Sequence, residues 1–175
     1  MGDQEIGLRY RLDPTSSADS PWAGAVQGLI SVPVYDSGRE PAPGPGGPGL
    51  ELRYSVGRHF QAARHAAFID VGTAVRLRGG EPADELRFDV VNGVYFTPRW
   101  LGLAEFNLIQ GLGNGKGYTP SSFIDSNNYD LMKLQLSLAP GLTENTRLQF
   151  GYEYDLRGRN TGAGSGPFIA LWLTF

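Results

Sequence analysis

The sequence predicts an all-β protein built from antiparallel strands, and three observations lead to this prediction. Helical periodicity is almost absent, whereas polar and apolar residues alternate with a period of two along most of the chain. Long and short connections alternate between these segments, as in an up-and-down sheet. Nine segments are predicted as strands, at roughly 5–12, 22–34, 50–58, 66–78, 85–97, 100–112, 131–142, 146–157 and 167–175.

The first strands place charged residues on one face and apolar residues on the other. Segment 5–12 carries Arg9 and Arg11 on its polar face, and 50–58 carries Glu51 and Arg53. The segments at 66–78 and 85–97 continue the pattern, with polar positions at Asp70, Arg76, Arg78, Arg87 and Asp89. Each of these segments is therefore predicted to be a strand with one polar and one apolar face.

The later strands repeat the pattern. Segment 100–112 is the least regular, although Glu105 interrupts its apolar run. Segment 131–142 sets Lys133 and Gln135 opposite a row of leucines. The clearest alternation is in 146–157, where Leu148, Phe150, Tyr152, Tyr154 and Leu156 oppose Arg147, Gln149, Glu153, Asp155 and Arg157.

The loops divide into two sets. Long loops rich in Gly, Pro, Ser and Asn are predicted at 35–49, 79–84, 113–129 and 158–166, all at one end of the strands. Short connections such as HFQAARH, FTPRW and LTENTR lie at the other end. Since the strand pattern continues on both sides of every loop, residues 1–175 are expected to form a single β-barrel domain.

Composition excludes several classes of protein. The net charge is −3 and the pI is near 5.3, so no basic surface indicates a nucleic-acid partner. No run of eighteen apolar residues occurs, which excludes a transmembrane helix. Hydrophobic residues make up 41% of the chain and cysteine is absent, values that by themselves fit a soluble protein as well as a membrane barrel.

Three features favour a transmembrane barrel, with its apolar face towards lipid, over a soluble ligand-binding barrel. The strands approach the ~9–11 residues that cross a bilayer at a tilt. Long loops at one end and short turns at the other are typical of outer-membrane barrels, in which the long loops are extracellular. Aromatic residues gather near the predicted strand ends, as interfacial girdles do: Trp22, Phe96, Trp100, Tyr118, Phe123, Tyr129, Tyr154 and Phe175.

The chain ends PFIALWLTF, with apolar residues at alternate positions up to a terminal aromatic residue. This stretch resembles the last strand of bacterial outer-membrane proteins, which the barrel-assembly machinery reads and which closes the barrel. On this resemblance the barrel-closing residues are Ile169, Leu171, Leu173 and Phe175.

Further segments resemble a family of outer-membrane transporters often grouped with meta-pathway phenol-degradation proteins. They are DQEIGLRYRL, LELRYSVGRHF, AFIDVGTAVRLRGGEPADELRFD and FTPRW. The family's barrels have about 12 strands, and an even strand number puts both termini in the periplasm. The resemblance therefore implies that three strands and a signal peptide precede residue 1.

The polar face is assigned to the barrel lumen. The predicted lumen-lining residues are Arg53, Asp70, Arg76, Arg78, Arg87, Asp89, Glu105, Lys133, Arg147, Glu153, Asp155 and Arg157. Opposite charges lie on neighbouring strands, so cross-strand ion pairs that satisfy one another are one interpretation. The other is that part of the set lines a permeation path, where rings of charge tune selectivity.

The predicted function is passive uptake of small solutes through the outer membrane, and the resemblance implies hydrophobic or aromatic ones. A structural or adhesive barrel with a plugged lumen and a soluble ligand-binding barrel stay open as alternatives. No enzyme, cofactor or metal site is predicted. His59 and His65 are both expected in a short turn, without a nucleophile or acid at a catalytic spacing. The expected partners are outer-membrane lipid, the barrel-assembly machinery and a small-molecule solute.

Overall fold

A computed structural model describes residues 3–12, 21–34, 47–116, 127–162 and 164–174. It confirms an all-β chain with nine antiparallel strands in up-and-down order. The strands are β1 (Asp3–Leu12), β2 (Trp22–Pro33), β3 (Gly49–Ala62), β4 (His65–Arg78), β5 (Glu85–Tyr95), β6 (Trp100–Gly111), β7 (Asp130–Pro140), β8 (Thr146–Arg159) and β9 (Ser165–Leu173). The described residues contain no helix with the length and apolarity that crossing a membrane requires.

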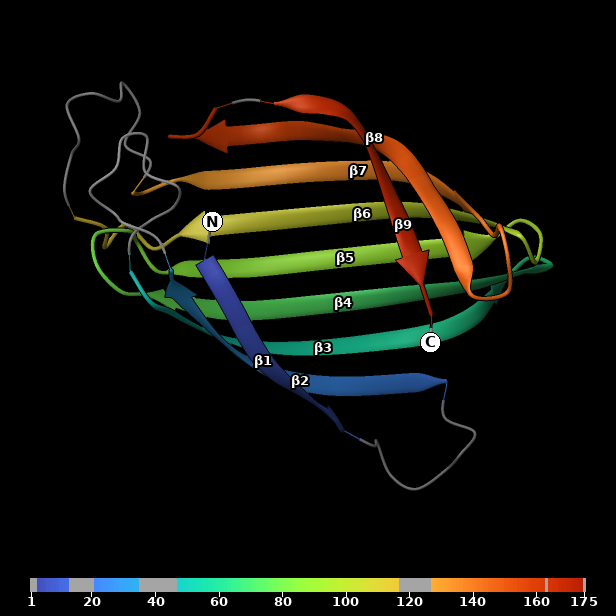
Figure 1. Ribbon diagram of the computed structural model, residues 1–175, viewed down its shortest axis with the longest axis horizontal. Coiled ribbons are helices and arrows are strands. Elements are labelled where there is room, and N and C mark those ends of the chain that lie inside the picture. The colour runs from blue at the N-terminus through green and yellow to red at the C-terminus, as the bar shows by residue number, and fades with distance from the viewer. Residues whose placement is uncertain (1–2, 13–20, 35–46, 117–126, 163, 175) are drawn as a thin grey trace.

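The nine strands form one sheet in which every strand pairs with its neighbours in the sequence. The sheet curls, so that β1 and β9 lie in front of the middle strands in Figure 1. In the described residues no ladder joins β1 to β9, and the sheet is therefore open. Because neighbours alternate in direction, β1 and β9 run parallel to each other. To close the sheet with antiparallel pairs only, an odd number of additional strands would have to fill the gap between β9 and β1.

The hairpin between β3 and β4 is tighter than the sequence suggests. β3 continues to Ala62 and β4 begins at His65, which leaves a two-residue turn. Ala63 in this turn has a φ of 57°, the left-handed conformation that such turns require. The expectation that His59 and His65 lie in a short turn is therefore wrong, because both belong to strands. β8 also extends to Arg159, so the predicted loop 158–166 is shortened to 160–164.

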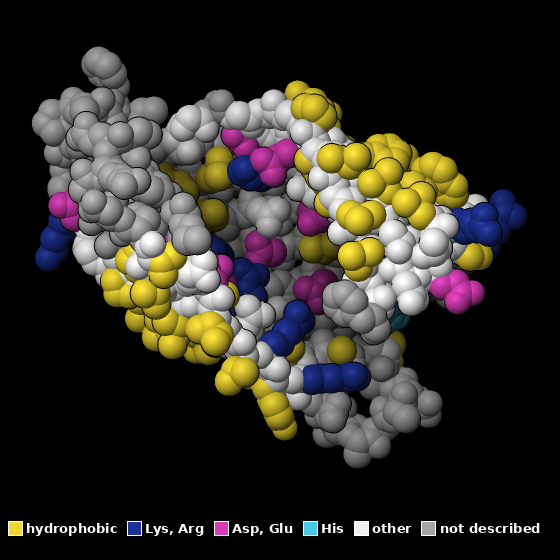
Figure 2. Space-filling model, viewed as in Figure 1, with side chains coloured by type: hydrophobic (Ala, Val, Ile, Leu, Met, Phe, Trp, Pro, Cys, Tyr) yellow, Lys and Arg dark blue, Asp and Glu magenta, His cyan; other side chains and the backbone are white. Residues whose placement is uncertain are grey.

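The face predicted to be apolar is the outer face of the curled sheet, and its large side chains are exposed. Leu8 is 85% exposed, Leu52 66% and Leu171 57%. Figure 2 shows acidic and basic side chains inside the hollow of the sheet, with hydrophobic side chains around its outer flanks. We call the surface of this hollow the inner face.

A β-bulge in β8 reverses the face of its last residues. Met132 pairs with Arg157, whereas Lys133 pairs with Asp155, which leaves Leu156 as the extra residue. Arg157 is therefore in register with Met132, which belongs to the outer face, although strict alternation predicts it in the lumen. Arg159 follows the same shift and pairs with Asp130, with 2.7 Å between Arg159 Nε and Asp130 Oδ2.

Part of the inner face is apolar. Leu101, Leu103 and Ala139 are buried there, at the end of the sheet where the short turns lie. Phe68, Val91 and Tyr95 pack against them. We call these six residues the inner apolar cluster. The polar inner face thus occupies the middle of the strands and the end that carries the long loops.

Candidate functional site: the inner face

The strongest concentration of charge lies on the inner face of β3, β4 and β5. Glu51 contacts three guanidinium groups, at 3.1 Å from Arg53, 3.2 Å from Arg87 and 3.8 Å from Arg76. Glu85 bridges Arg87 and Arg78, with 2.7 Å between its carboxylate and Arg87 Nη2. Both carboxylates are almost completely buried, Glu85 with a relative exposure of 1%.

Two further acids complete this charged network. Asp89 pairs with Arg53, and Glu5 on β1 reaches Arg76 at 2.8 Å. Four guanidinium groups therefore face four carboxylates: Arg53, Arg76, Arg78 and Arg87 against Glu5, Glu51, Glu85 and Asp89. This network forms one wall of the hollow, and the wall is close to neutral because each buried charge has a partner of opposite sign.

The opposite wall, on β6 to β9, is less charged and richer in amides. Glu105 accepts hydrogen bonds from Gln135 at 3.1 Å and from Gln149 at 3.4 Å. Gln149 in turn accepts one from the indole Nε1 of Trp172 at 2.8 Å. Lys133 pairs with Glu153 at 2.6 Å and lies 3.8 Å from Asp155. A solute in the hollow would therefore meet ion pairs on one wall and mainly neutral donors and acceptors on the other.

Arg147 closes the short-turn end of the inner face. Its guanidinium donates to the carbonyls of Ala139 at 3.1 Å, Arg99 at 3.3 Å and Pro98 at 3.4 Å. It also lies 5.5 Å from the centre of the Tyr95 ring, within range of a cation–π contact. Arg147 therefore joins two short turns across the inner apolar cluster.

The long-loop end is held by a junction between residues 81–84 and the segments 112–116 and 127–129. The Asp84 carboxylate accepts from the backbone N–H of Arg78 and from the Asn114 amide, both at 2.7 Å. These hydrogen bonds, that from Arg78 first, hold the pKa of Asp84 below its usual value. Ala83 N–H donates to the Asn127 carbonyl at 2.7 Å, which ties the two loops together.

Tyr129 extends this junction towards the charged wall. Burial, followed by the charge of Glu85 and a hydrogen bond to its carboxylate, raises the pKa of the Tyr129 hydroxyl. A neutral phenol thus lies against the most deeply buried carboxylate of the network. The sequence predicts Tyr129 in an aromatic girdle, but the residue packs against Glu85 and belongs to the junction.

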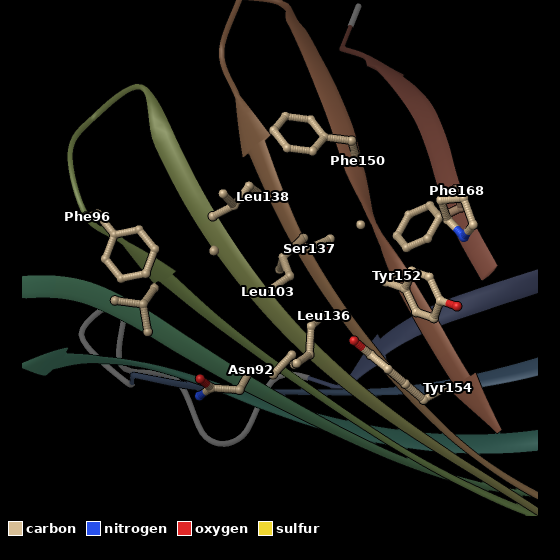
Figure 3. A pocket seen from close by; sticks show the side chains of 15 residues that line it. Asn92, Phe96, Leu103, Leu136, Ser137, Leu138, Phe150, Tyr152, Tyr154 and Phe168 are labelled. Carbon is tan, nitrogen blue, oxygen red and sulfur yellow. The ribbon is translucent and has the colours of Figure 1, made fainter. Parts of the chain in front are cut away.

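The outer face carries an apolar groove of about 760 Å³ over β5 to β9. Figure 3 shows the rings of Phe96 and Phe150 on opposite sides of it with Leu138 between them, and Leu136 further along the groove. Asn92 is a polar residue in its lining, and its amide donates to the Phe68 carbonyl at 3.2 Å. The groove continues the apolar outer surface.

Most of the residues predicted to line the lumen lie on the inner face. Strand alternation and pairing place these residues there: Arg53, Asp70, Arg76, Arg78, Arg87, Asp89, Glu105, Lys133, Arg147, Glu153 and Asp155. Arg157 is the exception because of the bulge. Ile169, Leu171 and Leu173 alternate on the outer face of β9, and Phe175 lies outside the described residues.

Some of the residues predicted to form aromatic girdles lie near strand ends, and others do not. Trp22, Phe96 and Trp100 lie near the short-turn end with exposed side chains. Tyr154 lies well inside β8, where its ring centre is 4.7 Å from that of Tyr152 and the two ring planes are inclined at 43°. Tyr118 and Phe123 fall outside the described residues.

Besides the inner apolar cluster, sequence reasoning missed Glu5, Glu85 and Trp172 on the inner face. Glu85 has the parity of Arg87, so strict alternation would have found it. Phe68 and Trp172 carry no such signal, because apolar residues were assigned to the outer face. Among the described residues no group of three or more His, Cys, Asp or Glu side chains could hold a metal ion. The chain matches no known family model, no curated protein and no solved structure.

Proposed function

We propose that the protein is an outer-membrane β-barrel channel for the passive uptake of small solutes. The distribution of charge supports this proposal. On the described strands, the charged side chains of the outer face are Arg58, four residues before the end of β3, and Asp130, Arg157 and Arg159 at the long-loop end of β7 and β8. Between them lies a broad surface of exposed leucine, valine, isoleucine and aromatic residues.

This broad apolar surface between the charged residues is the observation that carries the proposal. A soluble protein rarely exposes a contiguous apolar patch beyond a few hundred Å². In a bilayer the same surface meets hydrocarbon, and the charged network faces away from it. A soluble ligand-binding barrel would have the opposite arrangement.

Localisation and partners follow from the same proposal. The outer face would contact outer-membrane lipid, and the terminal strand would be read by the barrel-assembly machinery. The resemblance to outer-membrane transporters grouped with phenol-degradation proteins, and the three further strands that it implies, stay predictions. The solute class that it implies is hydrophobic or aromatic.

A structural barrel with a plugged lumen is the second candidate, and the inner apolar cluster favours it. Leu101, Leu103 and Ala139 bury side chains on a face that an open water-filled channel would keep polar. Arg147 adds hydrogen bonds across the same end. Solutes must pass this cluster if the channel is open.

Single-channel recording in planar bilayers tests the proposal against this alternative. The full-length folded protein should give discrete conductance steps, and liposomes containing it should take up small solutes. Tyr95→Ala should increase the conductance, since it removes a ring from the inner apolar cluster. Full-length folded protein that gives neither conductance nor uptake would reject the channel and support the plugged barrel.

A further inference from the structure

A second cavity, of about 680 Å³, opens on the inner face between β1 and β4. Arg9 and Arg11 line it from β1, Asp70 lines it from β4, and the rings of His59 and Phe68 lie in its wall. Sites for small molecules in proteins typically measure roughly 300–1,000 Å³. The cavity is therefore large enough for a small organic solute.

Small residues create this space. Ala23 pairs with Gly57, and Gly57 pairs with Asp70, so two successive strands place no long side chain between the arginines and the aspartate. Ala25, next along the inner face of β2, is buried. The curled sheet thus forms a shallow floor with a cationic side and an anionic side.

The charges here differ from those of the network on β3 to β5. Among the described residues, neither Arg9 nor Asp70 has a hydrogen bond or an ion pair through its side chain. The arginines of the network, in contrast, all contact carboxylates. Arg9 is exposed and Asp70 is partly exposed, so water solvates both charges in the free protein and leaves them available to a ligand in the cavity.

The rings restrict the shape of that ligand. His59 and Phe68 have ring centres 6.1 Å apart and planes inclined at 53°, so they form two sides of an aromatic wall. A flat ring packs well against such a wall. A guanidinium group binds a carboxylate through two parallel hydrogen bonds. Asp70, an acceptor when ionised, requires a donor such as a hydroxyl group.

We propose that this cavity binds a small ring-containing carboxylate that bears a hydroxyl group at its opposite end. Arg9 would hold the carboxylate, Asp70 would accept from the hydroxyl, and the ring would lie against Phe68 and His59. The proposal deepens the proposed function and rests on it for the route by which a solute reaches the cavity. Binding itself requires no conduction.

Isothermal titration of the protein in detergent with 4-hydroxybenzoate tests the site. Benzoate lacks the hydroxyl group and 4-hydroxybenzyl alcohol lacks the carboxylate, so each should bind more weakly, the alcohol by about tenfold or more. Arg9→Gln should lower the affinity for 4-hydroxybenzoate by about tenfold. Asp70→Asn should lower the affinity for 4-hydroxybenzoate but leave the affinity for benzoate unchanged. Loss of folding could not produce this difference, because it would lower both affinities.

Arg64→Gln is the matched control, because it removes one positive charge from the exposed turn at the same end of the sheet. Its affinity for 4-hydroxybenzoate should equal that of the unmodified chain. Absence of saturable binding, or equal binding by Arg9→Gln, would overturn the site. Binding without conductance would reject the channel and keep the site, whereas conductance without binding would do the reverse.

Discussion

At the scale of single residues, Glu85 is the most constrained charge of the inner face. Its side chain is 1% exposed and its two oxygens serve two arginines, Arg78 and Arg87. Removing one partner of a buried ion pair leaves the other charge uncompensated, which costs more than the pair contributes. The rest of the network cannot replace it, since Glu51 already contacts three arginines.

Glu85→Gln is therefore expected to lower the free energy of unfolding by about 3–5 kcal/mol. Guanidinium-induced unfolding in detergent micelles, followed by tryptophan fluorescence, measures this change. Glu81→Gln, in the exposed part of the adjacent loop, is the control and should change it by less than about 0.5 kcal/mol. Equal stability of the two variants would contradict the bridging role of Glu85.

Gly93 shows how closely the inner apolar cluster is packed. A Cβ atom at this position would overlap the ring of Phe68. We expect Gly93→Ala to destabilise the fold by about 1–3 kcal/mol, the usual cost of overpacking. Gly28→Ala, where a Cβ would meet no atom within 4 Å, is the control. If adding Phe68→Leu to Gly93→Ala restored no stability, the overlap would not be the cause.

At the scale of elements, alternation predicts all nine strands and the face of nearly every charge. It fails where one residue shifts the phase: Leu156 in the bulge carries Arg157 away from the inner face. A bulge leaves no mark in a single sequence here, since Tyr154, Leu156 and Arg157 continue a regular pattern. The inner apolar cluster was also missed, because alternation alone cannot tell an inward Leu103 from an outward leucine.

The loop junction around Asp84 is an element whose stability should depend on pH. The pKa of the Asp84 carboxyl is lowered in the folded chain. The carboxylate therefore stabilises the fold at pH values above its unfolded pKa of about 4. This contribution is lost as the pH falls through the lower folded value. The difference in unfolding free energy between the unmodified chain and Asp84→Asn should therefore be constant from neutral pH down to about pH 4 and shrink below it.

Denaturant titrations of both chains at several pH values measure this difference. The amide that replaces the carboxylate in Asp84→Asn cannot titrate, so the variant separates the effect of Asp84 from that of the other carboxylates. A difference that persisted unchanged into strong acid would show that the charge of Asp84 does not hold the junction.

At the scale of the whole molecule, the account depends on what surrounds the outer face. On the lipid-facing side of a barrel, arginine costs about 2–4 kcal/mol at the bilayer midplane and only about 0–1 near the interfaces. On a surface exposed to water, the same substitution changes stability by about 0.5 kcal/mol or less. Depth along a single strand therefore distinguishes the two surroundings.

Leu50 and Leu52 provide this comparison on the outer face of β3. Leu52 lies further from the long-loop end than Leu50, which is next to the first residue of the strand. Leu52→Arg should reduce the folded fraction in liposomes, measured by heat-modifiable mobility on gels, more than Leu50→Arg does. Equal effects of the two substitutions would indicate that no depth gradient exists.

The most direct measurement of the central claim uses the absence of native cysteine. Single cysteines at Leu52 and Leu136 on the outer face, and at the partly exposed Gln27 and Asn107 on the inner face, carry spin labels in the chain reconstituted into liposomes. Power-saturation spectroscopy then compares collisions with oxygen, which concentrates in the lipid, and with a water-soluble nickel chelate. Outer labels should collide mainly with oxygen and inner labels with the chelate. Outer labels that met the chelate as often as the inner ones would show that water, and not lipid, covers the apolar face.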